Sequence, residues 1–379
     1  MAKKLRVGVI FGGRSGEHEV SIRSAASVIQ AIDTKKYEIV PIAISREGKW
    51  LSAAEAFRLL PANAQSFLPS RPGPDSGAAL AILGDPSRTG LLSLEHNGSA
   101  VTSKKLDVVF PVLHGPFGED GTLQGLLEMA NLPYVGCGVL ASACGMDKVA
   151  MKLLFLQAGL PMCNYIWFLR SHWQKDRGGV IKSITRKIGL PCFVKPANLG
   201  SSVGVSRADD RESLKRAVDL AAQYDRKIVV EEAVDAREIE CAVIGNDEPR
   251  ASLPGEYVVH DESARFLDYT EKYTTTGRVA FVVPAPIPKA LTTRIQKMAL
   301  QAFRAVDGAG LARVDFFLKR GSSELLINEL NTMPGLTEVS GYPKMWAASG
   351  LTYSQMLDVL IDLALQRHRE KSLTRVDRM

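Results

Sequence analysis

The chain has few cysteines and no long hydrophobic run, and each scarcity excludes whole classes of protein. Its five cysteines among 379 residues include no C-x-x-C pair. An odd, unpatterned set is typical of free thiols in a reducing compartment, and it argues against a disulfide scaffold or a Cys/His zinc site. No apolar stretch approaches the roughly 20 residues that span a bilayer. We therefore expect a soluble cytoplasmic protein with no membrane partner.

An excess of charge of one sign is also nearly absent. The chain has 47 Lys and Arg residues against 41 Asp and Glu residues, a formal charge of +6, and much of the excess lies in residues 367–378. A charged terminus is typical of a solvated tail, so we expect no nucleic-acid partner. The mild basic excess does suit anionic small substrates such as nucleotides.

The first third of the chain alternates strand-like and helix-like segments. Residues 5–11, 37–45 and 106–112 form apolar runs, and residues 21–32 have helical spacing. This βαβ rhythm predicts a parallel sheet. The intervening residues 53–105 are rich in Pro, Gly, Ser and Ala, and they indicate a loose insertion with irregular elements.

The length of the chain predicts more than one domain, and the pattern suggests three. The first would be an N-terminal α/β domain over residues 1–138. Two mixed α+β domains would follow over residues 139–234 and 235–379, the last one containing a hairpin and a closing helix. Within it, the polar stretch 260–278 is a candidate for a mobile lid.

The predicted hairpin carries the strongest chemical signal. Arg313 and Asp315 share one face of its first strand, and Glu329 and Asn331 share one face of its second, because side chains alternate along a strand. A turn centred on Gly321 would place Arg313 nearly opposite Glu329, with Asp315 on the diagonal. Carboxylate and amide oxygens suit magnesium that bridges phosphates, and arginine suits a developing oxyanion. A surface ion-pair network is the alternative.

A second signal is Lys195, at the end of a predicted strand, followed by the small-residue loop 200–204. The amides and hydroxyls of such a loop can surround phosphate oxygens. The order of residues is not that of a P-loop. Alone, the segment would more often be a flexible connection, but the magnesium-type hairpin elsewhere in the chain favours a phosphate site.

A third signal is the pair of polar segments at 12–19 and 114–121, each directly after a predicted parallel strand. Ligands of open parallel sheets lie beyond the carboxyl ends of the strands. The alternatives are an acidic helix start at Glu119 and an ordinary polar histidine at His114.

Together these motifs resemble the D-alanine–D-alanine ligases of the ATP-grasp superfamily, and the resemblance runs nearly end to end. It implies a three-domain ATP-grasp architecture, in which the parallel-sheet domain is followed by two α+β domains that grip ATP. The matching motifs are Gly12-Gly13-x-Ser15-x-Glu17-His18-Glu19, His114-Gly115-x-x-Gly118-Glu119-Asp120-Gly121, Met146-Asp147-Lys148, Lys195-Pro196, Gly200-Ser201-Ser202-x-Gly204, Glu231 with Glu238, Lys272-Tyr273, Arg313-x-Asp315, Glu329-x-Asn331-x-x-Pro334-Gly335 and Ser340.

The resemblance also implies roles for single residues. Those that bind ATP would be Lys148, Lys195, Ser202 and Lys272 at the phosphates, with Glu231 and Glu238 at the adenine and ribose. Those that bind two Mg²⁺ ions, with Mn²⁺ as a substitute, would be Asp315, Glu329 and Asn331. Those that act on the substrates would be Glu17, Ser201 and Tyr273 at the first D-alanine, His114 and Ser340 in substrate binding, and Arg313 with the Gly335 amide at the tetrahedral intermediate.

The activity implied is ATP-dependent synthesis of D-alanyl-D-alanine through a D-alanyl phosphate, for peptidoglycan precursors, by a homodimer. Tyr273 favours the dipeptide, because relatives that make D-alanyl-D-lactate offer a histidine there. The alternatives are a D-alanine–D-lactate ligase or another ATP-grasp carboxylate–amine ligase. A non-catalytic nucleotide sensor is the alternative from a different class.

Overall fold

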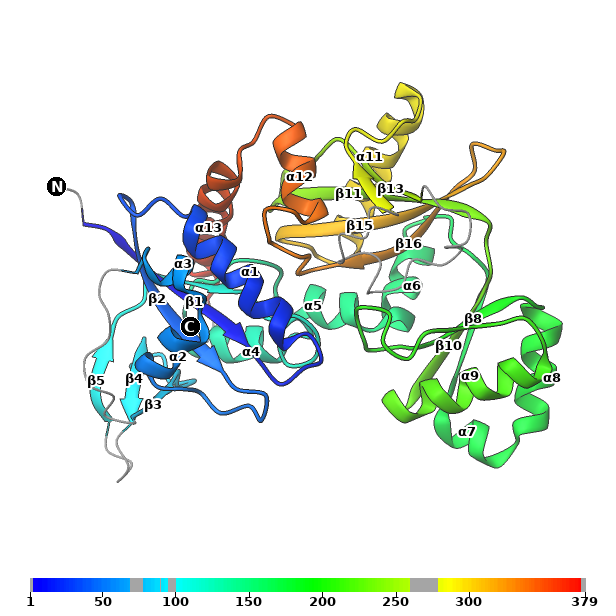
Figure 1. Ribbon diagram of the computed structural model, residues 1–379, viewed down its shortest axis with the longest axis horizontal. Coiled ribbons are helices and arrows are strands. Elements are labelled where there is room, and N and C mark those ends of the chain that lie inside the picture. Colours follow the sequence, from blue (N-terminus) through cyan, green and yellow to red (C-terminus); the bar gives the residue numbers. More distant parts are fainter. Residues whose placement is uncertain (1–2, 69–77, 89, 95–99, 260–278, 376–379) are drawn as a thin grey trace.

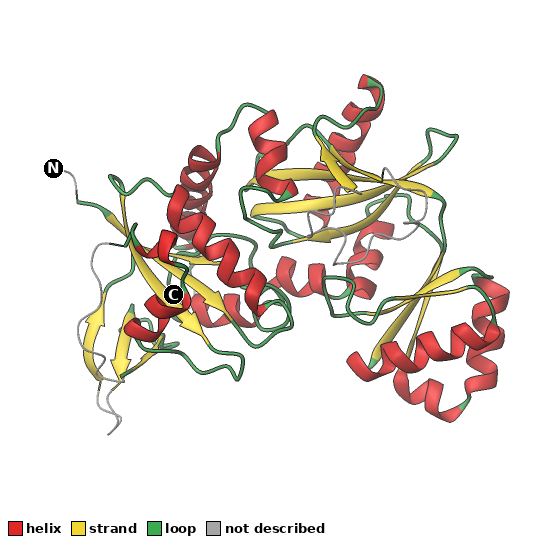
Figure 2. Cartoon of the chain, viewed as in Figure 1, coloured by secondary structure: helices red, strands yellow, loops and turns green. Residues whose placement is uncertain are grey.

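The computed structural model describes residues 3–68, 78–88, 90–94, 100–259 and 279–375 of the chain. The predicted lid, 260–278, lies outside the described residues. The N-terminal parallel sheet lies at one end of an elongated molecule, a small antiparallel sheet lies at the other end, and the largest sheet lies between them (Figure 1). Helices cover the faces of these sheets (Figure 2).

The N-terminal sheet has the predicted parallel arrangement. Strand β1 (Leu5–Gly12) lies between β2 (Tyr37–Ile44) and β6 (Val108–Pro111), and both neighbours run parallel to it. Helix α1 (His18–Ala31) makes the crossover after β1. Because helices and loops cover both faces of a parallel sheet, its strands read as continuous apolar runs, which explains why they were predictable.

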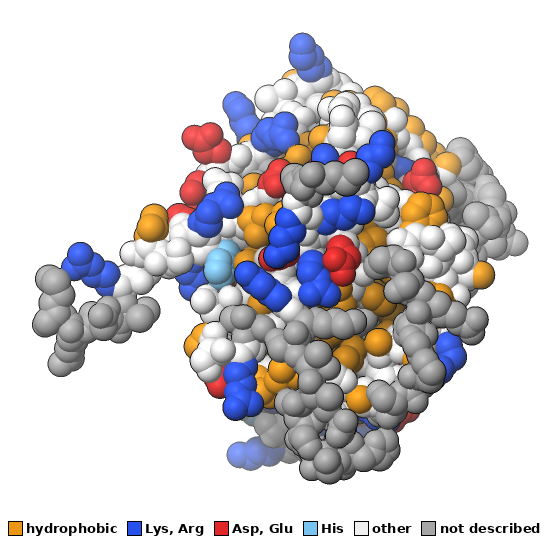
Figure 3. Space-filling view, turned by 90° about the vertical axis from the view of Figure 1, so that its left-hand side faces the viewer, with side chains coloured by type: hydrophobic (Ala, Val, Ile, Leu, Met, Phe, Trp, Pro, Cys, Tyr) orange, Lys and Arg blue, Asp and Glu red, His pale blue; other side chains and the backbone are white. Residues whose placement is uncertain are grey.

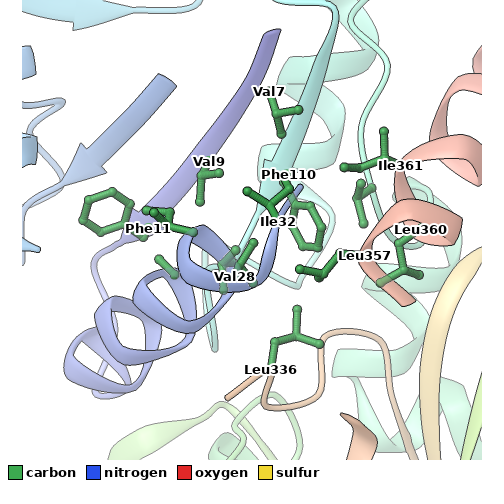
Figure 4. Packing of buried hydrophobic residues seen from close by; sticks show 14 of the residues in the cluster. Val7, Val9, Phe11, Val28, Ile32, Phe110, Leu336, Leu357, Leu360 and Ile361 are labelled. Atoms are coloured by element: carbon green, nitrogen blue, oxygen red, sulfur yellow. The ribbon is translucent and has the colours of Figure 1, made fainter. Parts of the chain in front are cut away.

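One face of this sheet is covered by α1 and by α13 (Tyr353–Lys371), a helix from the far end of the chain. In Figure 4, Val9 and Phe110 of the sheet face Val28 of α1 and Leu357 of α13. Leu336, from the loop after β16 (Leu325–Asn331), enters the same core and is fully buried. Burying one such side chain contributes about 1.5–3 kcal/mol.

The segment 53–105 is more regular than predicted. The helix α2 begins with a capping box, in which Ser52 Oγ accepts from Glu55 N and the Glu55 carboxylate accepts from Ser52 N. Apolar residues such as Ala56, Leu80 and Leu91 are buried, so a composition typical of loops also builds packed elements. These elements are α2 (Ala53–Leu59), α3 (Ala62–Gln65) and an antiparallel sheet of β3 (Ala79–Ala81), β4 (Leu91–Leu94) and β5 (Ala100–Lys104).

The central part of the chain forms a four-stranded antiparallel sheet in the order β7-β10-β8-β9. One face packs on α7, α8 and α9, and the other face meets α6. The strands are β7 (Tyr165–Leu169), β8 (Cys192–Pro196), β9 (Ser206–Ala208) and β10 (Lys227–Glu232). The helices are α5 (Val139–Met146), α6 (Lys148–Gln157), α7 (Arg170–Lys175), α8 (Arg177–Lys187) and α9 (Arg211–Tyr224).

The C-terminal part forms the largest sheet, with β11 in contact with β13 and β15, and β15 followed by β16. Along β15, residues Ala312, Val314 and Phe316 are buried in one core with α11, as the alternation predicts. The remaining elements are α4 (Thr122–Met129), β11 (Ala236–Gly245), β12 (Arg250–Ala251), β13 (Gly255–Val259), β14 (Val279–Val282), α11 (Lys289–Ala305), β15 (Gly310–Lys319) and α12 (Gly341–Ala348).

Two surface properties bear on the predicted class of protein. Across the described residues, no helix combines the length and the apolar character needed to cross a membrane. On the face at the N-terminal end of the molecule, basic side chains are mixed with acidic and hydrophobic ones (Figure 3). Mixed charge of this kind is usual for a globular protein surface.

Candidate active site

Two of the loops that form the site follow neighbouring parallel strands, β1 and β6, as the sequence predicts. The Ser21 hydroxyl joins them, since it accepts from Gly12 N at 2.8 Å and donates to Val112 O. Gly12 has φ +89, and an added Cβ would lie 2.2 Å from the Ile44 carbonyl oxygen, so only glycine fits this turn. The carboxyl ends of the two strands are thereby fixed side by side.

The small-residue loop of the central part reaches these N-terminal loops. The Ser201 hydroxyl donates a hydrogen bond to Glu17 Oε1, and so joins residues that are 184 positions apart. Ser201 and Ser202 have φ of 51° and 56°, in the left-handed region. Backbone amides in consecutive turns of this kind can form a concavity that binds anions. A carboxylate suited to a substrate ammonium therefore lies beside a loop suited to phosphate.

Glu119 is a buried acid within the predicted polar segment 114–121, for which an ordinary helix start was the alternative interpretation. Its Oε1 accepts from Gly115 N at 2.8 Å, and its Oε2 has no hydrogen-bond partner among the described residues. Burial, followed by the nearby charge of Glu17, raises the pKa of Glu119 well above its usual value. Its place in the motif of residues 114–121 was the available signal.

His114 links the N-terminal loops to the loop after β16. Its ring is buried, with Nδ1 3.1 Å from Met333 O and Nε2 3.2 Å from Ser24 Oγ. Because a carbonyl can only accept, Nδ1 carries the proton, and burial lowers the pKa of the ring. Both ring nitrogens are thus engaged, and a direct bond from either of them to a substrate would require one of these contacts to break.

Two lysines and one glutamate form a row of largely buried charges between α6 and the strands β8 and β10. Glu231 is 2% exposed, and its Oε2 and Oε1 lie 2.6 Å from Lys195 Nζ and 3.0 Å from Lys152 Nζ. The lysines outweigh the effect of burial and hold the pKa of Glu231 well below its usual value. Sequence reasoning predicted Lys195 and Glu231 but missed Lys152, which lies four residues after Lys148 on the otherwise apolar inner face of α6.

Lys148 is held at the start of α6, close to the small-residue loop 200–204. Asp147 caps this helix by accepting from Val149 N at 3.0 Å, and it also pairs with Lys227 of β10. The Lys148 ammonium donates to Leu199 O at 2.6 Å, directly before the loop 200–204. Burial lowers its pKa. This geometry suits a lysine that binds phosphates held by the loop.

The hairpin of β15 and β16 brings its four polar residues together, but in another register than predicted. Asp315 lies directly opposite Glu329, and Arg313 lies opposite Asn331 rather than Glu329. The turn pairs Lys319 with residue 324, which already shifts the register, and a bulge next to Asp315 shifts it by one residue more. All four side chains still share one face of the sheet.

Two carboxylates and an amide oxygen on one sheet face fit a hard cation. Asp315 and Glu329 are directly opposed like charges, an arrangement that is unfavourable unless a cation lies between or beside them. In the structure Arg313 supplies part of the positive charge that offsets these carboxylates, with Nε and Nη2 each 2.7 Å from one Asp315 oxygen. Oxygen donors of this kind suit Mg²⁺, with Asn331 as the neutral third ligand.

The loop after β16 is fixed from several sides. Met333 N donates to Asn331 Oδ1 at 2.9 Å, and the Tyr353 hydroxyl donates to Leu336 O. Ser340 ends this loop as the N-cap residue of α12, with its hydroxyl 2.6 Å from that of Thr337. The backbone amide of Gly335 therefore belongs to a restrained loop.

The other predicted site residues divide into two groups. Glu238 lies on β11, on the same sheet face as Asp315, because its neighbour Glu240 lies directly opposite that residue. Lys272 and Tyr273 lie outside the described residues.

The sequence matches two family models that together cover most of the chain. The model described as "D-ala D-ala ligase N-terminus" matches residues 6–137, and "D-ala D-ala ligase C-terminus" matches residues 154–362. Among curated relatives, the D-alanine–D-alanine ligases of Heliobacterium modesticaldum and Natranaerobius thermophilus are 48% and 46% identical. Each alignment covers 99% of both chains.

Solved structures give the same picture. A D-alanine–D-alanine ligase from Coxiella burnetii is 36% identical with a TM-score of 0.81, over 98% of this chain and 97% of that one. The VanG D-Ala:D-Ser ligase from Enterococcus faecalis is 37% identical with a TM-score of 0.81, over 96% of this chain and 100% of that one.

Proposed function

This chain belongs to the D-alanine–D-alanine ligase family, and we propose that it joins two D-alanine molecules into D-alanyl-D-alanine with ATP as the source of energy. The observation that carries the proposal is the hydrogen bond from Ser201 to Glu17, which brings an acid suited to an ammonium group next to the phosphate loop. The product would serve peptidoglycan precursor synthesis in the cytoplasm, where ATP is present. The homodimer rests on the family resemblance alone.

ATP would lie between the central and C-terminal sheets. Lys148, Lys195 and Ser202 would bind its phosphates, because two cations and the loop amides converge there. Lys272 would join them from the segment outside the described residues. The acceptors for the adenine and ribose would be Glu231 of β10 and Glu238 of β11.

Magnesium would be held by Asp315, Glu329 and Asn331, in two ions as in the family, with manganese as a substitute. Bound there, the metal would neutralise charge on the phosphates during transfer. The three ligands share a sheet face, and the bulge next to Asp315 sets the two carboxylates directly opposite each other.

The reaction would occur in two steps. Glu17 would hold the ammonium of the first D-alanine, and Ser201 would link Glu17 to Tyr273, which lies outside the described residues. The carboxylate oxygen of that D-alanine attacks the γ-phosphorus, and the bond to ADP breaks, which gives a D-alanyl phosphate. The neutral amine of the second D-alanine, whose carboxylate Ser340 binds, attacks the acyl carbon. Inorganic phosphate leaves and the amine loses a proton. Arg313 and the Gly335 amide stabilise the tetrahedral oxyanion, and His114 fixes the loop that carries Gly335.

The test is release of phosphate by the purified protein with ATP and Mg²⁺. D-alanine, L-alanine, and D-alanine mixed with D-serine or D-lactate would be compared, and products identified by mass. Release that depends on D-alanine, with the dipeptide as main product in every mixture, is expected. Absence of release with D-alanine would refute the proposal. A mixed product with D-serine would instead assign the acceptor specificity of the VanG neighbour.

Ser201→Ala is expected to raise the KM for the first D-alanine by about 10–100-fold, because a hydrogen bond to a charged group contributes about 1.5–3 kcal/mol. Initial rates at varied D-alanine concentrations measure this. Ser202→Ala is the matched control, since it places alanine in the same left-handed conformation of the same loop. It should change the KM for ATP instead. Equal effects of both variants on D-alanine would contradict the role of Ser201.

A further inference from the structure

Three carboxylates, not two, lie side by side across the active-site sheet. Glu240 of β11 is directly opposite Asp315 of β15, which is directly opposite Glu329 of β16. Neighbouring like charges on one sheet face repel each other. The magnesium set proposed above takes the carboxylates of Asp315 and Glu329 together with the neutral amide of Asn331, so the third acid, Glu240, needs a function of its own.

The next row along the strands contains the group that Glu240 meets. There Ala242, Arg313 and Asn331 lie opposite one another, and the small side chain of Ala242 leaves room beside the arginine. The Arg313 guanidinium contacts two of the three carboxylates. Its Nε lies 3.2 Å from Glu240 Oε1 and 2.7 Å from Asp315 Oδ1. Glu240 is only 3% exposed, so water screens this pair weakly.

Arg313 and magnesium have competing demands on Asp315. In the structure both Asp315 oxygens accept from the Arg313 fork, at 2.7 Å each. A magnesium ion binds carboxylate oxygens at about 2.0–2.1 Å with strict geometry, and it withdraws charge from the oxygen that it binds. Arg313 therefore loses much of its hold on Asp315 when the metal binds, unless another acid keeps it in place.

We propose that Glu240 is a positioning residue, which holds Arg313 at the reacting acyl group while Asp315 binds magnesium. The inference rests on the proposed function. In this proposal Asp315 and Glu329 bind the metal, and Glu240 holds Arg313. Strand β11 thereby contributes to the second step, in which the amine attacks the acyl phosphate.

The other oxygen of Glu240 packs against the acceptor side of the site. A Cβ built on Gly341 would lie 2.7 Å from Glu240 Oε2 and 2.9 Å from the Phe281 ring. Gly341 is the first residue of α12 and follows Ser340, which would bind the second D-alanine. Glu240 thus sets the spacing between Arg313 and the acceptor loop, and no larger residue fits at position 341 without moving it.

The experiment compares Glu240→Gln with Glu256→Gln, a matched pair of substitutions on one sheet. Glu256 is 4% exposed and forms a two-bond pair with Arg237, at 2.6 Å for each bond. It lies opposite Ile239, whose side chain packs in the core with α11, so its pair is on the other face of the sheet. The control therefore removes an equally buried arginine partner away from the site.

Two readouts are expected to change in Glu240→Gln and to stay unchanged in Glu256→Gln. The kcat for D-alanine ligation should fall about 10–100-fold, with the KM for ATP and D-alanine within about threefold, because Arg313 acts in the transition state. Mn²⁺ affinity, measured by electron paramagnetic resonance with an unreactive ATP analogue, should weaken about 3–10-fold, because Arg313, without the charge of Glu240, then pairs more strongly with Asp315. Glu240→Asp should restore part of both.

Each other outcome counts against the proposal. Unchanged kcat and Mn²⁺ affinity in Glu240→Gln, or equal losses in Glu256→Gln, would overturn it. If Glu240→Gln does not fold, Gly341→Ala replaces it, because the added Cβ displaces Glu240 from the side of α12. The same fall in kcat and the same loss of Mn²⁺ affinity are then expected. If the wild-type protein releases no phosphate with D-alanine, the proposed function fails, and the Mn²⁺ measurement alone still decides whether Glu240 competes for Arg313.

Discussion

Glu329→Gln is expected to lower kcat by about 10²–10³-fold or more while ATP still binds. Metal stabilisation of a transferring phosphoryl group contributes several kcal/mol, and each 1.36 kcal/mol corresponds to a factor of ten in rate. Glutamine keeps the shape of the side chain and removes the charge that faces Asp315 across the hairpin. ATP would still contact Lys148 and Lys195, which belong to the central part of the chain.

The measurements for this variant are phosphate release at varied Mg²⁺ and nucleotide affinity by calorimetry. Glu324→Gln is the control, because Glu324 is at the same hairpin and pairs with Lys319 at 2.6 Å, but its side chain is 52% exposed. It should leave turnover unchanged. Loss of turnover with binding retained would exclude the nucleotide sensor. Full turnover in Glu329→Gln would remove Glu329 from the metal set.

Glu231→Gln is expected to destabilise the protein by about 3–5 kcal/mol, because breaking a buried ion pair leaves uncompensated charge. Lys152 and Lys195, whose side chains are 1% and 14% exposed, would then face a neutral amide. Urea unfolding at neutral pH measures the loss. The double variant Glu231→Gln with Lys152→Met removes one buried cation and should recover part of the stability. No recovery would show that the lysines are not the cause.

The same substitution has a defined pH dependence. The two lysines hold the pKa of Glu231 below its ordinary value of 4.5. A depressed pKa in the folded state stabilises the protein fully above the unfolded pKa, and the contribution is lost as the pH falls below about 4.5. The difference between wild type and Glu231→Gln should therefore shrink on acidification. Glu128→Gln, which removes the charge that pairs with the exposed Lys371, should cost less than about 1 kcal/mol at neutral pH, because its amide oxygen can still accept from the Tyr134 hydroxyl.

The parallel sheet and the site face of β15 were predictable because burial leaves a local pattern of apolar residues in the sequence. Continuous apolar runs marked β1, β2 and β6, and strict alternation from Ala312 to Lys319 separated the core face from the polar face. The hairpin register was not predictable to one residue. The turn and the bulge next to Asp315 each shift the pairing by one residue without any change in composition, and the predicted partner of Arg313 was therefore wrong.

Residues that act through buried partners were the hardest to find. Lys152 looks like a solvated lysine on an amphipathic helix until Glu231 is placed beside it. Glu240 alternates with apolar residues like any exposed strand position, and only the register of three strands reveals Arg313 as its partner. His114 bonds a backbone carbonyl 219 residues away, a contact that no local pattern encodes.

Helix α13 has a consequence for the order in which the protein can be made. It covers the N-terminal sheet and is tied to it at several points, including Arg367 Nη1 to Gly136 O at 2.6 Å and Lys36 to Asp358 at 2.6 Å. During translation, at roughly 5–20 residues per second, the apolar face of that sheet emerges roughly ten seconds or more before its cover. The nascent chain therefore exposes a hydrophobic surface of the kind that chaperones bind. A chain that ends before residue 353 would leave exposed the part of this sheet face that α13 covers.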